Sequence, residues 1–99
     1  MTEASAEFTE DGFLGGQLRL RQPKCGHRAG HDAILLAAAT PARAGDRVVD
    51  FGAGIGAAGL AVAKRTNGFN PGIKLVLVEV DAALARLARD NAASNAIPA

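Results

Sequence analysis

The stretch VVDFGAGIGAAG, residues 48–59, decides the fold, because an apolar run meets an acidic residue and then a series of glycines. The two valines show no helical periodicity and glycines follow at once, so residues 47–51 are predicted to form a strand. Glycines at positions 52, 54 and 56 let the backbone turn sharply and let a ligand approach where a Cβ would intrude. Residues 57–65 have helical composition, so the first N–H groups of a helix would face whatever the loop holds.

A second strand and helix follow the first pair. Residues 74–80 are almost continuously apolar, as in a strand covered on both faces of a parallel sheet. Asp81 is predicted to cap a helix whose apolar side carries Leu84, Leu87, Ala88 and Ala92. The order predicts an α/β fold: a partial Rossmann-like parallel sheet unit, preceded by a β-hairpin and a short helix.

The N-terminal part has different patterning. Residues 1–11 are acidic and lack periodicity, which predicts a flexible leader. Gly15-Gly16 stands between two short runs and predicts a hairpin with a two-residue turn. Asp32 is placed to cap a short helix that stops before Pro41. We therefore divide the chain into a leader (1–11), a hairpin and helix segment (12–45), and the first βαβα part of a cofactor-binding domain (46–99).

Composition narrows the class of protein. The chain has 99 residues and a net charge of +1, which fits one small domain without a strong field of its own. Cys25 is the single cysteine, so no internal disulfide and no cysteine metal site can form, and we expect no metal. The longest apolar run, 33–39, is too short to cross a bilayer. We expect a cytoplasmic protein with no membrane partner, and solvated loop histidines at His27 and His31.

Two carboxylates suggest what the glycine loop holds. Asp50 precedes the loop and Glu79 ends the next strand, so parallel pairing would bring both to one sheet edge, where open α/β sheets bind ligands. Glu79 could accept hydrogen bonds from ribose hydroxyls, although without Asp50 and the glycines nearby it would be interpreted as a surface acid at a strand end. Gly54, Gly56 and Gly59 also fit a dinucleotide fingerprint, so NAD stays open. Asp50 would repel a pyrophosphate and attract the ammonium group of S-adenosylmethionine.

The same residues resemble a known family. VVDFGAGIGAAGLAVAKR and VLVEVDAALARLARDNAASN are similar to the first motif and the second strand and helix of class I, Rossmann-like S-adenosylmethionine-dependent methyltransferases. More narrowly, the N-terminal segment resembles the small-domain methyltransferases that modify N6 of an adenine in a valine tRNA. The matching positions are Gln22, Pro23, Gly26, Arg28, Asp32, Leu35, Leu36 and Ala37.

The resemblance implies a role for each matched residue. Asp50, Gly52 and Gly54 would hold the methionine end of S-adenosylmethionine, Glu79 its ribose, and Val80 would flank the adenine. The loop residues Ala53 and Gly56 complete the candidate cofactor-binding set. Arg28 and Asp32 would reach the same pocket from the N-terminal segment. No catalytic residue is assigned, because the Asn-Pro-Pro-aromatic turn of the resembled family is absent from this sequence.

The function expected from the sequence is therefore the N-terminal, cofactor-binding portion of a methyltransferase acting on adenine N6 of tRNA or another RNA. The alternatives are a fragment of an NAD-binding dehydrogenase and a non-catalytic nucleotide-binding or interaction module. RNA would contact the basic residues near the N-terminus, and open sheet edges would allow self-association. The basic residues are Arg19, Arg21, Lys24 and Arg28.

Overall fold

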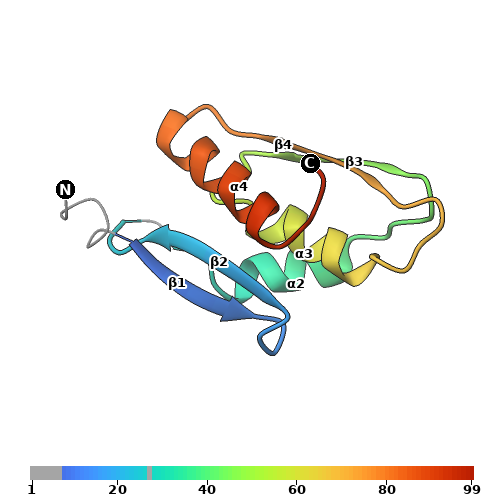
Figure 1. Ribbon diagram of the computed structural model, residues 1–99, viewed down its shortest axis with the longest axis horizontal. Helices are drawn as coiled ribbons and strands as arrows, with labels where there is room; N and C mark the ends of the chain where they lie inside the picture. Colours follow the sequence, from blue (N-terminus) through green and yellow to red (C-terminus); the bar gives the residue numbers. More distant parts are fainter. Residues whose placement is uncertain (1–7, 27) are drawn as a thin grey trace.

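The computed structural model describes residues 8–26 and 28–99. The hairpin is β1 (Phe8–Phe13) and β2 (Leu18–Pro23), followed by helix α2 (His31–Ala39). A βαβα unit follows, made of β3 (Arg47–Phe51), α3 (Ala57–Arg65), β4 (Lys74–Val78) and α4 (Ala82–Ser94). Figure 1 shows α3 and α4 between the hairpin and the β3–β4 pair, with α2 beside α3. The α/β class and the preceding hairpin are confirmed.

The two strands of the βαβα unit pair in parallel, as predicted, with Asp50 opposite Leu77 and Phe51 opposite Val78. The predicted second strand continues to residue 80, but β4 ends at Val78. Beyond that point the backbone N–H groups of Gly52 and Ala53 both donate to the Val78 carbonyl, each at 2.9 Å. The ladder therefore passes directly into the glycine loop.

Helix α3 is the centre of the core. Most of its residues are buried, because the helix contacts α2 on one side and β2, β3 and β4 on others. Gly59 allows the closest approach to the sheet, since a Cβ there would lie 2.7 Å from Leu77 Cδ2 and 3.1 Å from Asp50 Oδ2. The absence of a side chain at Gly59 therefore brings α3 close enough to touch the strand that carries Asp50.

Helix α4 follows its sequence pattern closely. The Asp81 side chain accepts the Leu84 N–H at 3.0 Å and caps the helix as predicted. Leu87, Ala88 and Ala92 are buried, whereas the charged residues between them are exposed. The same face packs against β2, so α4 ties the hairpin to the βαβα unit.

Three predictions about the N-terminal part are wrong. Strand β1 begins at Phe8, so residues 8–11 belong to the hairpin and not to the leader; residues 1–7 and His27 lie outside the described part. The hairpin loop has four residues, because Leu14 takes a φ of 55° alongside Gly15 and Gly16. Helix α2 begins at His31 after Gly30, and Asp32 lies in its first turn without capping it.

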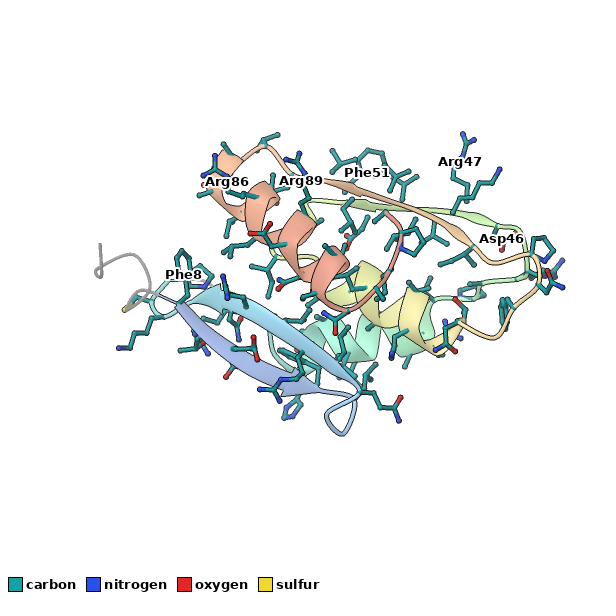
Figure 2. The ribbon with its side chains drawn as sticks, in the orientation of Figure 1. Phe8, Asp46, Arg47, Phe51, Arg86 and Arg89 are labelled. Carbon is teal, nitrogen blue, oxygen red and sulfur yellow. The ribbon has the colours of Figure 1, made fainter. Side chains whose placement is uncertain are left out.

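The β3–β4 pair has one covered face. Its inner face packs on α3, but the outer residues Val49, Phe51, Val76 and Val78 are exposed. Figure 2 shows Phe51, which is 79% exposed, projecting from the side of the sheet away from the helices. The expectation of a sheet covered on both faces is therefore wrong for the described residues. Within the same residues, no helix combines the length and apolar character needed to span a membrane.

Candidate functional site

A cleft of about 630 Å³ lies where β3 and β4 end. Its volume is in the range of small-molecule sites in proteins. Parallel pairing brings the predicted acids together here, as the sequence indicates. Of the candidate residues, the following line the cleft: Asp50, Gly52, Ala53, Gly54 and Glu79.

Two candidate residues are not part of the cleft wall. Gly56 is buried under the loop as the N-cap of α3, with a left-handed φ of 93°, and a Cβ there would lie 3.1 Å from Leu60 Cδ1. Val80 is 98% exposed and follows Glu79 outside the cleft lining. Gly56 therefore shapes the turn into α3, and the role of Val80 beside an adenine stays a prediction.

Asp50 links β3 to the start of α3. Its Oδ2 accepts the N–H of Gly59 at 3.0 Å, a bond that satisfies one of the free donors in the first turn of the helix. Burial raises the pKa of the Asp50 carboxyl above its ordinary value, and the bond from Gly59 opposes that rise. Asp50 thus holds a partly desolvated negative charge beside the loop, which a cationic ligand would stabilise.

The glycine loop is open on its cleft side. Gly52 and Gly54 have left-handed φ values of 72° and 59°, which residues with a Cβ rarely adopt. A Cβ at either position would meet nothing within 4 Å. Space for a ligand therefore lies directly against the loop backbone.

Glu79 reaches from the end of β4 to the loop. Its Oε1 accepts the Gly54 N–H at 2.7 Å, and its Oε2 accepts the Asp81 N–H at 2.9 Å. The bond from Asp81 and then that from Gly54 lower the pKa of the Glu79 carboxyl. Each carboxylate oxygen still has a second lone pair, so Glu79 can accept further hydrogen bonds from a ligand.

The segment that leads into α2 forms the opposite wall of the cleft. Arg28 and Asp32 line it, as the resemblance implies, together with His31 and Leu36. The Arg28 guanidinium donates to Asp11 Oδ2 and Thr9 Oγ1, each at 3.0 Å, and to the Pro23 carbonyl. This arginine is therefore engaged in hydrogen bonds within the fold although it stays partly exposed, and its contact to RNA phosphate stays a prediction.

The side chain of Gln22 also holds this wall of the cleft in place, a role that the sequence analysis did not predict. Its side chain is 2% exposed, donates to Asp11 Oδ2 at 2.8 Å and accepts the Ala29 N–H at 2.9 Å. The bonds from Gln22 and Thr9, followed by the nearby Arg28, lower the pKa of Asp11. A signal was present, because Gln22 continues the buried alternation of Leu18 and Leu20, and a buried amide needs partners.

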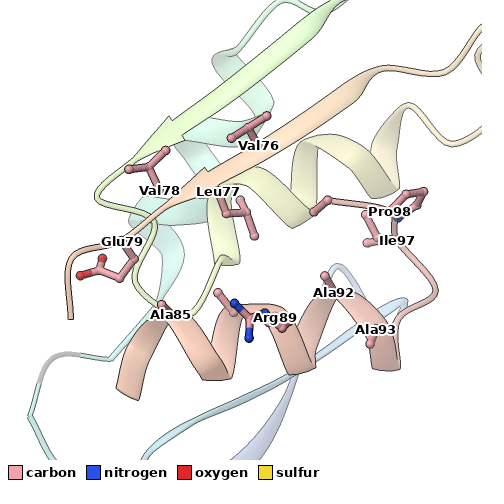
Figure 3. A pocket seen from close by; sticks show the side chains of 12 residues that line it. Val76, Leu77, Val78, Glu79, Ala85, Arg89, Ala92, Ala93, Ile97 and Pro98 are labelled. Atoms are coloured by element: carbon pink, nitrogen blue, oxygen red, sulfur yellow. The ribbon is translucent and has the colours of Figure 1, made fainter. Parts of the chain in front are cut away.

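A larger groove, of about 760 Å³, lies between β4 and α4 (Figure 3). Apart from Glu79 at one end and Arg89 on α4, its lining is apolar, with Leu77 and the alanines of α4 facing each other. This groove excludes the glycine loop and Asp50, so we assign the ligand site to the smaller cleft. Within the described residues, no group of three histidine, cysteine or acidic side chains is placed to hold a metal ion.

A parallel strand–helix–strand unit with a glycine loop and two carboxylates at its strand ends defines an α/β protein of the Rossmann-like class. Comparison with known families gives the particular one: the model of the family described as "Methyltransferase small domain" matches residues 28–99. The chain belongs to this family of methyltransferases.

Individual relatives are similar over most of the chain. A tRNA1(Val) (adenine(37)-N6)-methyltransferase of Dickeya chrysanthemi is 38% identical over 84 residues, covering 85% of this chain and 32% of the relative. The enzyme of the same name from Enterobacter sp. (strain 638) is 34% identical over 95 residues, covering 96% of this chain and 38% of the relative. The chain thus spans about a third of the length of these relatives.

The burial of Asp50 gives a prediction about stability and pH. Asp50→Asn keeps an oxygen for the Gly59 N–H and removes the charge that burial disfavours. Because the folded pKa of this acid is raised, its charged form lowers the free energy of unfolding at neutral pH, and that penalty vanishes as the pH falls through the folded pKa. We expect Asp50→Asn to raise the Tm at pH 7, with the gain shrinking towards the ordinary aspartate pKa of about 4.

Thermal unfolding followed by circular dichroism between pH 4 and pH 8 measures this effect. Asp90→Asn, at an exposed position on α4, is the matched control and should leave the Tm unchanged. A lower Tm at pH 7 for Asp50→Asn would contradict the account. It would mean that the charge stabilises the N-terminus of α3 by more than its burial costs.

Proposed function

We propose that this chain binds S-adenosylmethionine in the cleft at the ends of β3 and β4, as the cofactor-binding portion of a methyltransferase that modifies adenine N6 of tRNA. One observation carries the proposal: Asp50, the open backbone of Gly54 and the carboxylate of Glu79 line one cleft. The family of the chain and the printed names of its relatives support the reaction class.

The polar groups that line the cleft fit such a cofactor. Asp50 would bind the ammonium group of the methionine end, because a partly desolvated carboxylate gains more from a cation than a fully hydrated one. Glu79 would accept hydrogen bonds from the two ribose hydroxyls through its remaining lone pairs. Gly52 and Gly54 leave room for the ligand to lie against the backbone.

The bound cofactor supplies a methyl group already activated on a sulfonium. The residues of this chain bind and orient it, and positioning of this kind can provide a large part of a rate enhancement. Residues 28–33 supply a further part of the cleft wall. We assign no catalytic residue within the described part.

Dehydrogenase and purely structural functions are less well supported. The spacing of Gly54, Gly56 and Gly59 suits a dinucleotide, but a pyrophosphate at this loop would lie against the negative charge of Asp50. The family match favours methyl transfer over hydride transfer. A non-catalytic nucleotide-binding module would share the cleft and differ only in lacking turnover.

The role of Glu79 is testable by binding. Glu79→Gln preserves the shape of the side chain and removes the charge that strengthens its bonds to ribose hydroxyls. We expect about tenfold weaker binding of S-adenosylhomocysteine, which corresponds to about 1.4 kcal/mol. Isothermal titration calorimetry measures it, with Glu10→Gln on the hairpin as the control of the same chemistry. Equal affinities for wild type and Glu79→Gln would contradict the assignment.

We also propose that the outer face of the hairpin contacts RNA phosphates. Arg19 and Arg21 alternate with buried residues, so both project from the exposed side of β2, and the exposed Lys24 follows. Arg19 forms an exposed ion pair with Glu10 at 3.1 Å, which leaves its other guanidinium nitrogens accessible. Arg28 is left out of this set because its guanidinium is already paired with Asp11.

Arg21→Ala should therefore weaken tRNA binding and reduce the slope of log K against log salt by about one unit. Fluorescence anisotropy with labelled tRNA at several salt concentrations measures both quantities. Arg47→Ala is the control, because Arg47 is the first residue of β3 and lies away from the hairpin (Figure 2). An unchanged slope for Arg21→Ala, or an equal loss for Arg47→Ala, would contradict a specific role of the hairpin.

Self-association through the open edges of the β3–β4 pair is a second, separate proposal, and the exposed apolar face of the same pair supports it. Phe51→Ser would then shift the chain from dimer to monomer in size-exclusion chromatography with light scattering. A monomeric wild type would refute it.

We also propose a cytoplasmic location, which fits the free, exposed thiol of Cys25 and an RNA substrate.

A further inference from the structure

Asn91 is a buried polar residue at the junction of three parts of the fold. Its side chain is 2% exposed and comes from the face of α4 that packs against the hairpin. Its Oδ1 accepts the Arg21 N–H at 2.7 Å, and its Nδ2 donates to the Arg21 carbonyl and to the Ile55 carbonyl, each at 3.0 Å. Asn91 therefore joins α4, β2 and the glycine loop.

The bonds to Arg21 have a counterpart one helical turn later. Asn95 accepts the Arg19 N–H at 3.0 Å and donates to the Arg19 carbonyl at 2.7 Å. Four helical residues rise about 6 Å and two strand residues about 6.6 Å, so the spacings of the two pairs agree. The two asparagine side chains thus make the backbone hydrogen bonds along the edge of β2 that a neighbouring strand would otherwise make. Of the two, Asn91 alone has a bond to the loop among the described residues.

The bond to the Ile55 carbonyl fixes the loop through Asn91, a residue outside the cleft lining. At the ends of β3 and β4, Gly52 and Ala53 donate to Val78, and Gly54 donates to Glu79. A ligand that hydrogen-bonds to Glu79 would use the remaining lone pairs of a carboxylate that already accepts the Gly54 N–H. Asn91 is not part of the cleft lining, so a ligand in the cleft would not contact its side chain directly.

We propose that Asn91 is a positioning residue for the glycine loop, which sets the loop in its binding geometry and couples it to the hairpin. The effect on cofactor affinity rests on the proposed function, whereas the effect on loop order does not. The inference applies to the 99-residue chain and can be tested without catalytic activity.

Amide hydrogen exchange followed by NMR is the direct test, with Asn95→Ala as the matched control for the lost edge bonds. Asn91→Ala should speed exchange of the Gly52, Gly54 and Gly56 amides at least tenfold relative to Asn95→Ala. Both variants should loosen β2 to a similar degree. S-adenosylhomocysteine should bind at least tenfold more weakly to Asn91→Ala and within twofold of wild type to Asn95→Ala.

Equal loop exchange in the two variants would overturn the proposal. If Asn91→Ala does not fold, wild type still decides: the side-chain amide protons of Asn91 should exchange no faster than the loop amides, and faster exchange would overturn it. If wild type shows no affinity for S-adenosylhomocysteine while the loop still responds selectively to Asn91→Ala, the proposed function fails and the positioning role stands.

Discussion

The parallel pairing of β3 with β4 is the constraint on which the rest of the site depends. It sets Phe51 opposite Val78, so both strands end at one edge and their following residues meet there. The Val78 carbonyl then accepts two consecutive loop N–H groups, and Glu79 accepts a third. A shift of this pairing by one residue would turn the Asp50 side chain to the other face of the sheet and separate it from α3.

The close packing of α3 against the sheet gives the Asp50 carboxylate a hydrogen-bond partner. Gly59 lets the helix approach the sheet until its N–H reaches Asp50, and the same contact buries the carboxylate enough to raise its pKa. A group that costs stability in the free protein is well suited to gain energy from a cationic ligand. Under the proposed function, the site would lose stability in exchange for binding, as functional sites often do.

The strands, helices and caps that depend on adjacent residues were predictable from the sequence. The bounds of β3 and α3 and the cap at Asp81 agree with the structure, since each follows from adjacent residues. The hairpin turn was not predictable in the same way, because Leu14 takes a left-handed conformation that its residue type disfavours. The burial of Gln22 was predictable from its alternation with Leu18 and Leu20, but the role of Asn91 was not. The partners of Asn91 lie 36 and 70 residues away, and only the fold brings them together.

The central claim is that a carboxylate beside an open glycine loop selects a cofactor with a cationic amino-acid end. An NMR titration of the isotope-labelled chain with S-adenosylmethionine and with NAD, in parallel at equal concentrations, tests it most directly. The account predicts that S-adenosylmethionine shifts the amides of Gly52 and Gly54 and binds at least tenfold more tightly than NAD. Equal or tighter binding of NAD at the same amides would contradict it.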